Sequence, residues 1–181
     1  MSIPNTIKVC LAGLIILPGC VTAALGQDGA PTQQADGKVV FREPFTLKLQ
    51  LDKKHYYVEE FKKVPYVQGG DVYLFCGDYF GLGLDIENGA IRGISYQRDL
   101  LKSDVALKFS QGPSVEHNTM MSLVIENRSQ HKLFLDALMT VPGRKGVFKT
   151  SVVPVLPRTT NFESWPHPIV QLVLRNIRLQ K

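Results

Sequence analysis

The amino-acid sequence predicts an all-β protein: an antiparallel β-sandwich with one short helix, preceded by a signal peptide and a flexible tether. Beyond residue 40, apolar side chains alternate with polar ones in run after run, which is the period of a half-buried strand. Glycine, proline and an Asn-Gly pair interrupt these runs at short intervals, and no long helical runs alternate with them. The first forty residues differ, with an apolar run followed by small polar residues.

The beginning of the chain has the features of an export signal. The uncharged run VCLAGLIIL covers residues 9–17 and follows the single charge of Lys8, within the roughly 7–15 residues of a signal-peptide core. The following LPGC is similar to the bacterial lipoprotein signal, whose cysteine is lipidated and becomes the first residue of the mature protein. This resemblance implies a signal peptide over residues 1–20 and lipidation of Cys20.

A second processing route is cleavage after residue 26. Small residues at Ala24 and Gly26 fit the pattern before a cleavage site, and this route would release a protein that starts at Gln27. Residues 26–37 are small and polar without a periodic apolar face, so the segment 21–40 is predicted to be a flexible linker. We therefore expect a protein of the periplasm or cell envelope, attached to the membrane through its N-terminal lipid if Cys20 is acylated.

Residues 41–181 are expected to form a single sandwich domain, because one core suits a chain of this length. Alternation predicts about nine strands, including 45–51, 80–86 and 105–109, and Asn88-Gly89 is a tight-hairpin signal. Gly81 and Gly83 lie within one of these runs, where glycine allows close packing or a bend. Cys76 is the only cysteine beyond the leader, so no internal disulfide is expected, and it reads as a small buried hydrophobe.

The predicted helix covers about residues 53–63. Tyr57, Phe61 and Val64 are spaced on one helical face, and Pro65 would end the helix. Glu59 and Lys63 add a favourable pair four residues apart.

The second half of the domain predicts a β-meander. Its sequence MMSLVIENRSQHKLFLDALMTVPGRKGVFKT contains three strands joined by NRSQ and PGRKG. The strand ending in Glu-Asn, the short polar turn and LFLDAL are similar to immunoglobulin-like domains of bacterial envelope proteins. That resemblance implies an architecture and no activity. The final run, PIVQLVLRNIRLQ, fits both periods, and we expect a strand with a bulge near Asn176.

Motifs of catalysis or ligand binding are missing from the sequence. The four histidines are isolated, no Cys-x-x-Cys or His-Glu-x-x-His occurs, and GISYQ lacks the last glycine of a nucleophile elbow. We therefore predict no metal, no cofactor and no enzymatic activity. The formal net charge of +5 is spread over the chain without a basic stripe, which argues against nucleic acid as a partner.

Two aromatic clusters are the predicted partner-binding sites. The first contains Tyr56, Tyr57 and Phe61, in a segment rich in tyrosine. The second contains Trp165 and His167 in a proline-stiffened stretch, where a rigid aromatic side chain can anchor a partner. In the alternative interpretation, Trp165 fills the open end of the sandwich.

These observations predict a non-enzymatic envelope protein that binds a protein partner. The partner would be a periplasmic toxin, which the chain inhibits as an immunity protein, or a component of a secretion or assembly system. The alternative is a periplasmic protein that binds a small ligand or metal, or a hydrolase whose site is assembled from distant residues. A purely structural envelope lipoprotein is the third class.

Overall fold

The computed structural model describes residues 39–112 and 119–180. The predicted signal peptide, Cys20, and the linker up to residue 38 lie outside the described residues. No helix within the described ranges has both the length and the apolar character needed to span a bilayer.

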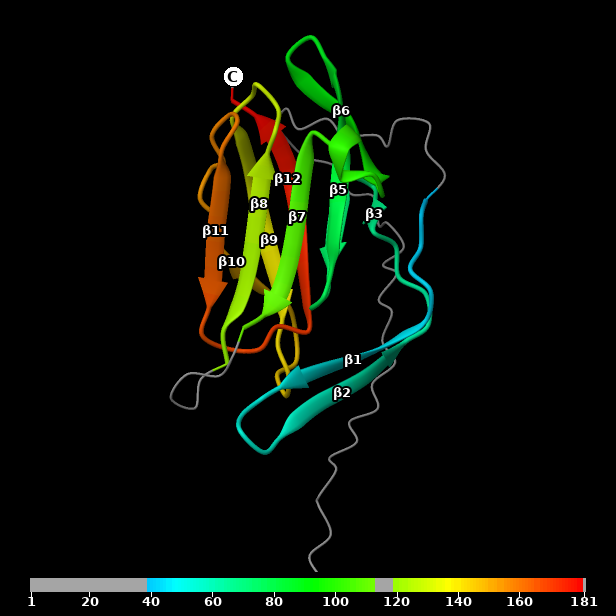
Figure 1. The fold of residues 1–181 in the computed structure, drawn as a ribbon, viewed down its shortest axis with the longest axis vertical. Coiled ribbons are helices and arrows are strands. Elements are labelled where there is room, and N and C mark those ends of the chain that lie inside the picture. Colours follow the sequence, from blue (N-terminus) through cyan, green and yellow to red (C-terminus); the bar gives the residue numbers. More distant parts are fainter. Residues whose placement is uncertain (1–38, 113–118, 181) are drawn as a thin grey trace, which may run out of the picture. The chain divides into compact units, whose positions relative to one another are not determined.

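Antiparallel strands make up most of the described chain (Figure 1). The strands are β1 (Phe45–Gln50), β2 (Tyr56–Phe61), β3 (Val67–Gln68), β4 (Asp71–Leu74), β5 (Tyr79–Glu87), β6 (Ala90–Gln97), β7 (Val105–Gln111), β8 (Met121–Asn127), β9 (Leu133–Thr140), β10 (Phe148–Thr150), β11 (Thr160–Trp165) and β12 (Gln171–Leu179). One short 3-10 helix, η1 (Leu100–Lys102), precedes β7. The prediction of an all-β protein is confirmed, and short strands such as β3 and β10 account for the excess over the nine expected.

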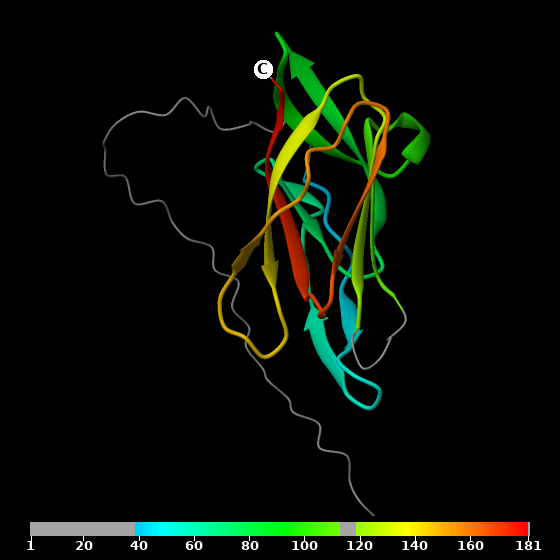
Figure 2. The same cartoon turned by 90° about the vertical axis from the view of Figure 1, so that its left-hand side faces the viewer.

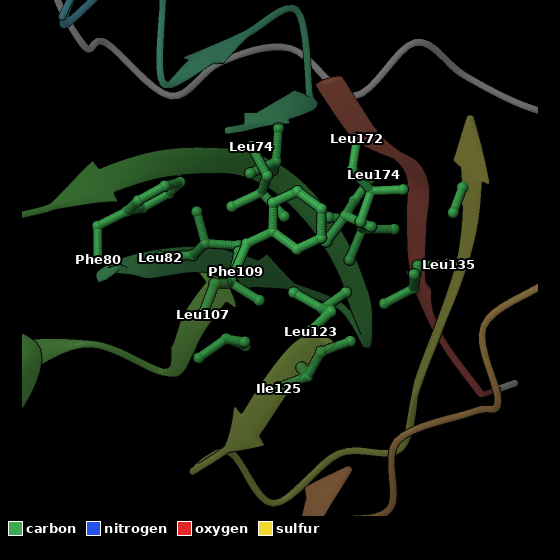
Figure 3. Packing of buried hydrophobic residues seen from close by; sticks show 14 of the residues in the cluster. Leu74, Phe80, Leu82, Leu107, Phe109, Leu123, Ile125, Leu135, Leu172 and Leu174 are labelled. Atoms are coloured by element: carbon green, nitrogen blue, oxygen red, sulfur yellow. The ribbon is translucent and has the colours of Figure 1, made fainter. Parts of the chain in front are cut away.

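Two five-stranded sheets share one hydrophobic core. The first sheet has the order β10-β9-β12-β4-β3 and the second has the order β11-β8-β7-β5-β6. Figure 2 shows the two layers from the side. Figure 3 shows how alternate side chains of both sheets meet in the core. Among these residues, Leu74, Leu135, Leu172 and Leu174 come from the first sheet, and Phe80, Leu82, Leu107, Phe109, Leu123 and Ile125 come from the second. The described part is therefore sandwich-like, with the core filled from both faces.

Two local predictions are confirmed. Asn88 and Gly89 form the turn between β5 and β6, with φ of 51° and 72°. The last strand has an irregularity between Arg175 and Arg178, and Asn176 within it has a φ of 50°. An irregularity of this kind is a β-bulge, in which one strand has an extra residue. Beyond the bulge, side chains again alternate into the core.

The predicted helix over 53–63 is wrong, because this segment forms β2 and pairs with β1 in a two-stranded sheet. Tyr57 and Phe61 are four residues apart, and a separation of four satisfies both a helical face and a strand face. The Asp52 carboxylate accepts hydrogen bonds from the amides of Lys54 and His55, at 2.8 and 2.9 Å. These bonds close a hairpin turn, which favours the strand over the helix. These bonds lower the pKa of Asp52 to about 2.

The predicted meander is also wrong at its first connection. β8 pairs with β7 and β11 in the second sheet, whereas β9 pairs with β12 and β10 in the first. The buried side chain of Asn127 fixes this crossing by donating to the carbonyls of His131 and Leu156, at 2.8 and 2.9 Å. Its Oδ1 accepts from the amide and hydroxyl of Ser129. The five-residue connection 128–132, held by these bonds, carries the chain across the core instead of along one sheet.

A buried arginine fastens the segment before β1 to both sheets. Arg42 is 7% exposed, and its guanidinium donates to the carbonyls of Pro65 and Tyr73, each at 2.6 Å. It also forms an ion pair of 2.6 Å with Asp78, and it stacks 3.9 Å from the ring centre of Tyr66. Every charge of this cluster is thus paired inside the fold, as a buried ion pair requires.

Gly81 of β5 has no room for a side chain, which confirms that this run needs a glycine for close packing. A Cβ atom there would lie 2.3 Å from Cβ and 2.7 Å from Oγ of the buried Ser103. We expect Gly81→Ala to lower the free energy of unfolding by about 1–3 kcal/mol, measured by urea denaturation. Gly112→Ala is the control, because its nearest neighbour is 3.7 Å away. An equal loss in both variants would contradict the packing seen here.

Candidate partner-binding surface

The first predicted cluster is divided between the two faces of the β1–β2 hairpin. Tyr56 is 50% exposed on the outer face, while Tyr57 and Phe61 pack against the core. The Phe61 ring stacks on Phe45 with a centroid distance of 5.1 Å and meets the edge of Phe75 at 4.8 Å. Of the three residues, Tyr56 alone is largely exposed to solvent.

The hairpin lies against the sandwich and is tied to it by hydrogen bonds between a side chain and the main chain. Leu47 and Leu49 of β1 are buried, and the side-chain amide of Gln111 at the end of β7 both donates to and accepts from the backbone of Gln50, each at 2.9 Å. On the outer face, the Lys48 ammonium lies 4.4 Å from the ring centre of Tyr56. Beside them, Val58 is 57% exposed.

The second cluster is mostly turned inward. Trp165 belongs to β11, is 7% exposed, and donates from Nε1 to the Thr150 hydroxyl at 2.9 Å. Its ring meets Phe109 edge-on at 6.4 Å. His167 is half-buried, with Nδ1 at 3.2 Å from the Pro168 carbonyl. These positions match the alternative interpretation, in which Trp165 fills the sandwich.

An exposed row of side chains crosses the outer face of the second sheet, the face toward the reader in Figure 1. We name it the outer stripe. Strand register pairs Tyr79 of β5 with Lys108 of β7, Lys108 with Val124 of β8, and Val124 with Phe162 of β11. Tyr79 is 58% exposed and Phe162 is 72% exposed. Because neighbouring strands are about 4.8 Å apart, the stripe is about 14 Å long, with an aromatic side chain at each end.

Small side chains flank the outer stripe on one side. Ser110, Ser122 and Ser164 form the adjacent row of cross-strand partners on β7, β8 and β11. Short side chains leave the neighbouring aromatic rings accessible. The result is an exposed row with two aromatic anchors, Tyr79 and Phe162.

Charges near the outer stripe are largely neutralised within the chain. Arg128 donates to both carboxylate oxygens of Glu126, each at 2.8 Å, and this pair lowers the pKa of Glu126. Arg128 also donates to the Leu100 carbonyl. Lys108 has no ion-pair partner among the residues that the structure describes.

Two grooves among the described residues open broadly to solvent. The larger groove, of about 430 Å³, lies among the loops around Arg128, His131 and Arg158. No group of three or more His, Cys, Asp or Glu side chains gathers at metal-binding distance within 39–112 and 119–180. Cys76 is a half-buried free thiol, and burial raises its pKa, which makes it a poor nucleophile at neutral pH.

The sequence reasoning missed Phe162 and Tyr79. Phe162 stands three residues before Trp165, so the two side chains point to opposite faces of a strand. Assigning the tryptophan to the core therefore assigns the phenylalanine to the surface. The odd spacing of Phe162 and Trp165 is the signal in the sequence that could have found this exposed phenylalanine.

Comparisons of the chain with protein-family models, with curated proteins and with solved structures find no match.

Proposed function

We propose that this chain is a non-enzymatic protein of the cell envelope that binds a protein partner through the outer stripe. The observation that carries the proposal is the exposure of Tyr79 and Phe162 at the two ends of one cross-strand row. Aromatic side chains are enriched at the centres of protein interfaces, because they bury a large area and lose little conformational entropy.

Rigidity supports the same proposal. Both anchors stand on strands that pair with their neighbours in the sheet, so the surface is already arranged before a partner arrives. The filled core and the open grooves favour a protein partner over the alternative of a small ligand or a metal, which a deeper, enclosed site would serve better.

The finer architecture and the location are part of the proposal. An immunoglobulin-like sandwich is supported by two antiparallel sheets over one core. Export and lipidation at Cys20 are supported by the leader sequence alone. An envelope protein of this kind would act as an inhibitor of a periplasmic toxin or as an accessory part of a secretion or assembly system.

Capture from the membrane fraction tests the outer stripe. The double variant Tyr79→Ala with Phe162→Ala is expected to recover at least about tenfold less of the stoichiometric partner than the parent chain, since removing two aromatic anchors weakens an interface by more than about 1.4 kcal/mol, which is tenfold in the dissociation constant. The matched control is Tyr56→Ala with Val58→Ala, which removes similar exposed apolar area from the hairpin. The proposal fails if the parent recovers no stoichiometric protein, or if both double variants lose it equally.

A further inference from the structure

The edges of the two sheets differ in how they are protected from pairing. β10 has three residues and β3 has two, and β6 has a register irregularity beside β5. Short or irregular edges of this kind discourage the addition of another strand. β11 is different: six residues, TNFESW, with no proline, glycine or lysine inside the strand.

The backbone of β11 has a set of hydrogen-bonding groups that face away from its own sheet. The amide of Asn127 donates to the Thr159 carbonyl at 2.9 Å, so odd-numbered residues of this segment bond to β8. In an antiparallel ladder, alternate residues point their N–H and C=O groups to opposite sides. The groups of Thr160, Phe162 and Ser164 therefore face the open edge, and β11 has no second neighbour among the described strands.

Exposed apolar side chains border this edge. Val153 is 61% exposed, and it lies beside β11 because its amide donates to the Glu163 carboxylate at 2.8 Å. Leu156 is 52% exposed, and its carbonyl accepts from the Thr159 hydroxyl at 2.9 Å. Together with Phe162, these residues make the edge both apolar and rich in free backbone groups, a combination that marks a strand-pairing site.

We propose that a second copy of this chain pairs its β11 with this β11, antiparallel, around a twofold axis at Phe162. The symmetry places Phe162 opposite its copy and Thr160 opposite Ser164. Each hydrogen-bonded pair exchanges two bonds, so the three pairs form roughly six. The three side chains are uncharged, so no like charges meet on the outer face.

The inner side of the pairing is also complementary. The same register places Asn161 of one copy opposite Glu163 of the other, an amide opposite a carboxylate. A side-chain amide donates to a carboxylate, as Asn161 does to Glu163 within one chain at 2.9 Å. β2 is a weaker candidate for self-pairing, because the residues on its exposed face include the charged Glu60.

The dimer joins the two outer stripes into one. Ten strands would form a continuous sheet, with the stripe of one copy running directly into that of the other through the paired Phe162 residues. This consequence rests on the proposed function, because the doubled stripe offers a symmetric or bivalent partner two sets of anchors.

Sedimentation of the full chain, in the same nonionic detergent for all samples, tests the pairing. The parent is expected to sediment as a dimer, and Ser164→Pro to raise the dimer dissociation constant about tenfold or more, because proline removes a donor at the open edge. That amide does not bond to β8, so the monomer keeps its fold, which circular dichroism checks. Ser164→Ala keeps the donor and is expected to remain a dimer. A monomeric parent, or equal effects of the two variants, overturns the proposal.

Disulfide formation tests the position of the axis. Opposite residues in a hydrogen-bonded pair are about 5.5 Å apart between Cα atoms, within disulfide range. In a Cys76→Ser background, Phe162→Cys is expected to form a covalent dimer that Ser164→Cys does not form. A covalent dimer of Ser164→Cys but not of Phe162→Cys overturns the twofold axis at Phe162. So does a Phe162→Cys variant that forms no more covalent dimer than the Cys76→Ser background.

Partner capture separates this proposal from the proposed function. Tyr79→Ala is expected to weaken capture and leave the dimer unchanged. A dimeric parent that captures no partner would refute the proposed function alone. A monomeric parent whose capture is lost in Ser164→Pro would mean that the edge takes a strand of the partner, which refutes the self-pairing alone.

Discussion

Arg42→Met is expected to lower the free energy of unfolding by about 3–5 kcal/mol. The substitution leaves the Asp78 carboxylate, whose side chain is 14% exposed, without its cation. It also removes the donors that the carbonyls of Pro65 and Tyr73 accept from at 2.6 Å. The Phe75 amide still donates to Asp78 at 2.7 Å, but a buried carboxylate without its cation costs far more than the lost packing of a side chain.

Two comparison variants, measured by urea denaturation, separate the effect of the buried charge from the loss of an arginine side chain. Arg92→Ala removes an exposed arginine, 3.6 Å from Glu87, and is expected to change stability by less than about 0.5 kcal/mol. Adding Asp78→Leu to Arg42→Met is expected to recover part of the loss, because it removes the orphaned charge. A loss below about 1 kcal/mol for Arg42→Met would mean that the arginine is not buried as described.

Phe109→Ala is expected to cost about 3–5 kcal/mol of unfolding free energy. Phe109 is completely buried at the centre of the core (Figure 3). Its ring meets the Trp165 ring edge-on. Removing the ring leaves a cavity that residues of two paired sheets cannot easily close. Lys108→Ala, one residue earlier on the outer face of β7, is expected to change stability by less than about 0.5 kcal/mol. Similar losses in both variants would contradict the strand alternation.

Strand alternation could be predicted wherever one face of a strand is buried. In β8, for example, the alternation of the sequence predicts the buried side chains directly: Met121, Leu123 and Ile125. Pairing could not be predicted in the same way, because alternation fixes which face of a strand is buried and says nothing about which strand lies beside it. The crossing after Asn127 depends on side-chain bonds to residues nearly thirty positions later in the chain.

The candidate surface was harder to predict than the core. Composition points to Tyr56, Tyr57 and Phe61 together, whereas Tyr56 faces outward and the other two side chains turn inward. The outer stripe depends on register across four strands, so its members are scattered from Tyr79 to Phe162 in sequence. The role of Arg42 was invisible for the same reason, since its partners lie 23 to 36 residues away.

Phe162 and Trp165 lie on opposite faces of β11, the first exposed and the second buried. Tryptophan fluorescence tests this orientation most directly. Trp165 is the only tryptophan, so the parent is expected to emit at short wavelength and to resist quenching by acrylamide. A chain with Trp165→Phe and Phe162→Trp, which moves the indole three residues along β11, is expected to emit at longer wavelength and to be quenched readily. The same shielded emission from both chains, or a parent that is readily quenched, would contradict the outward orientation of Phe162 on which the outer stripe depends.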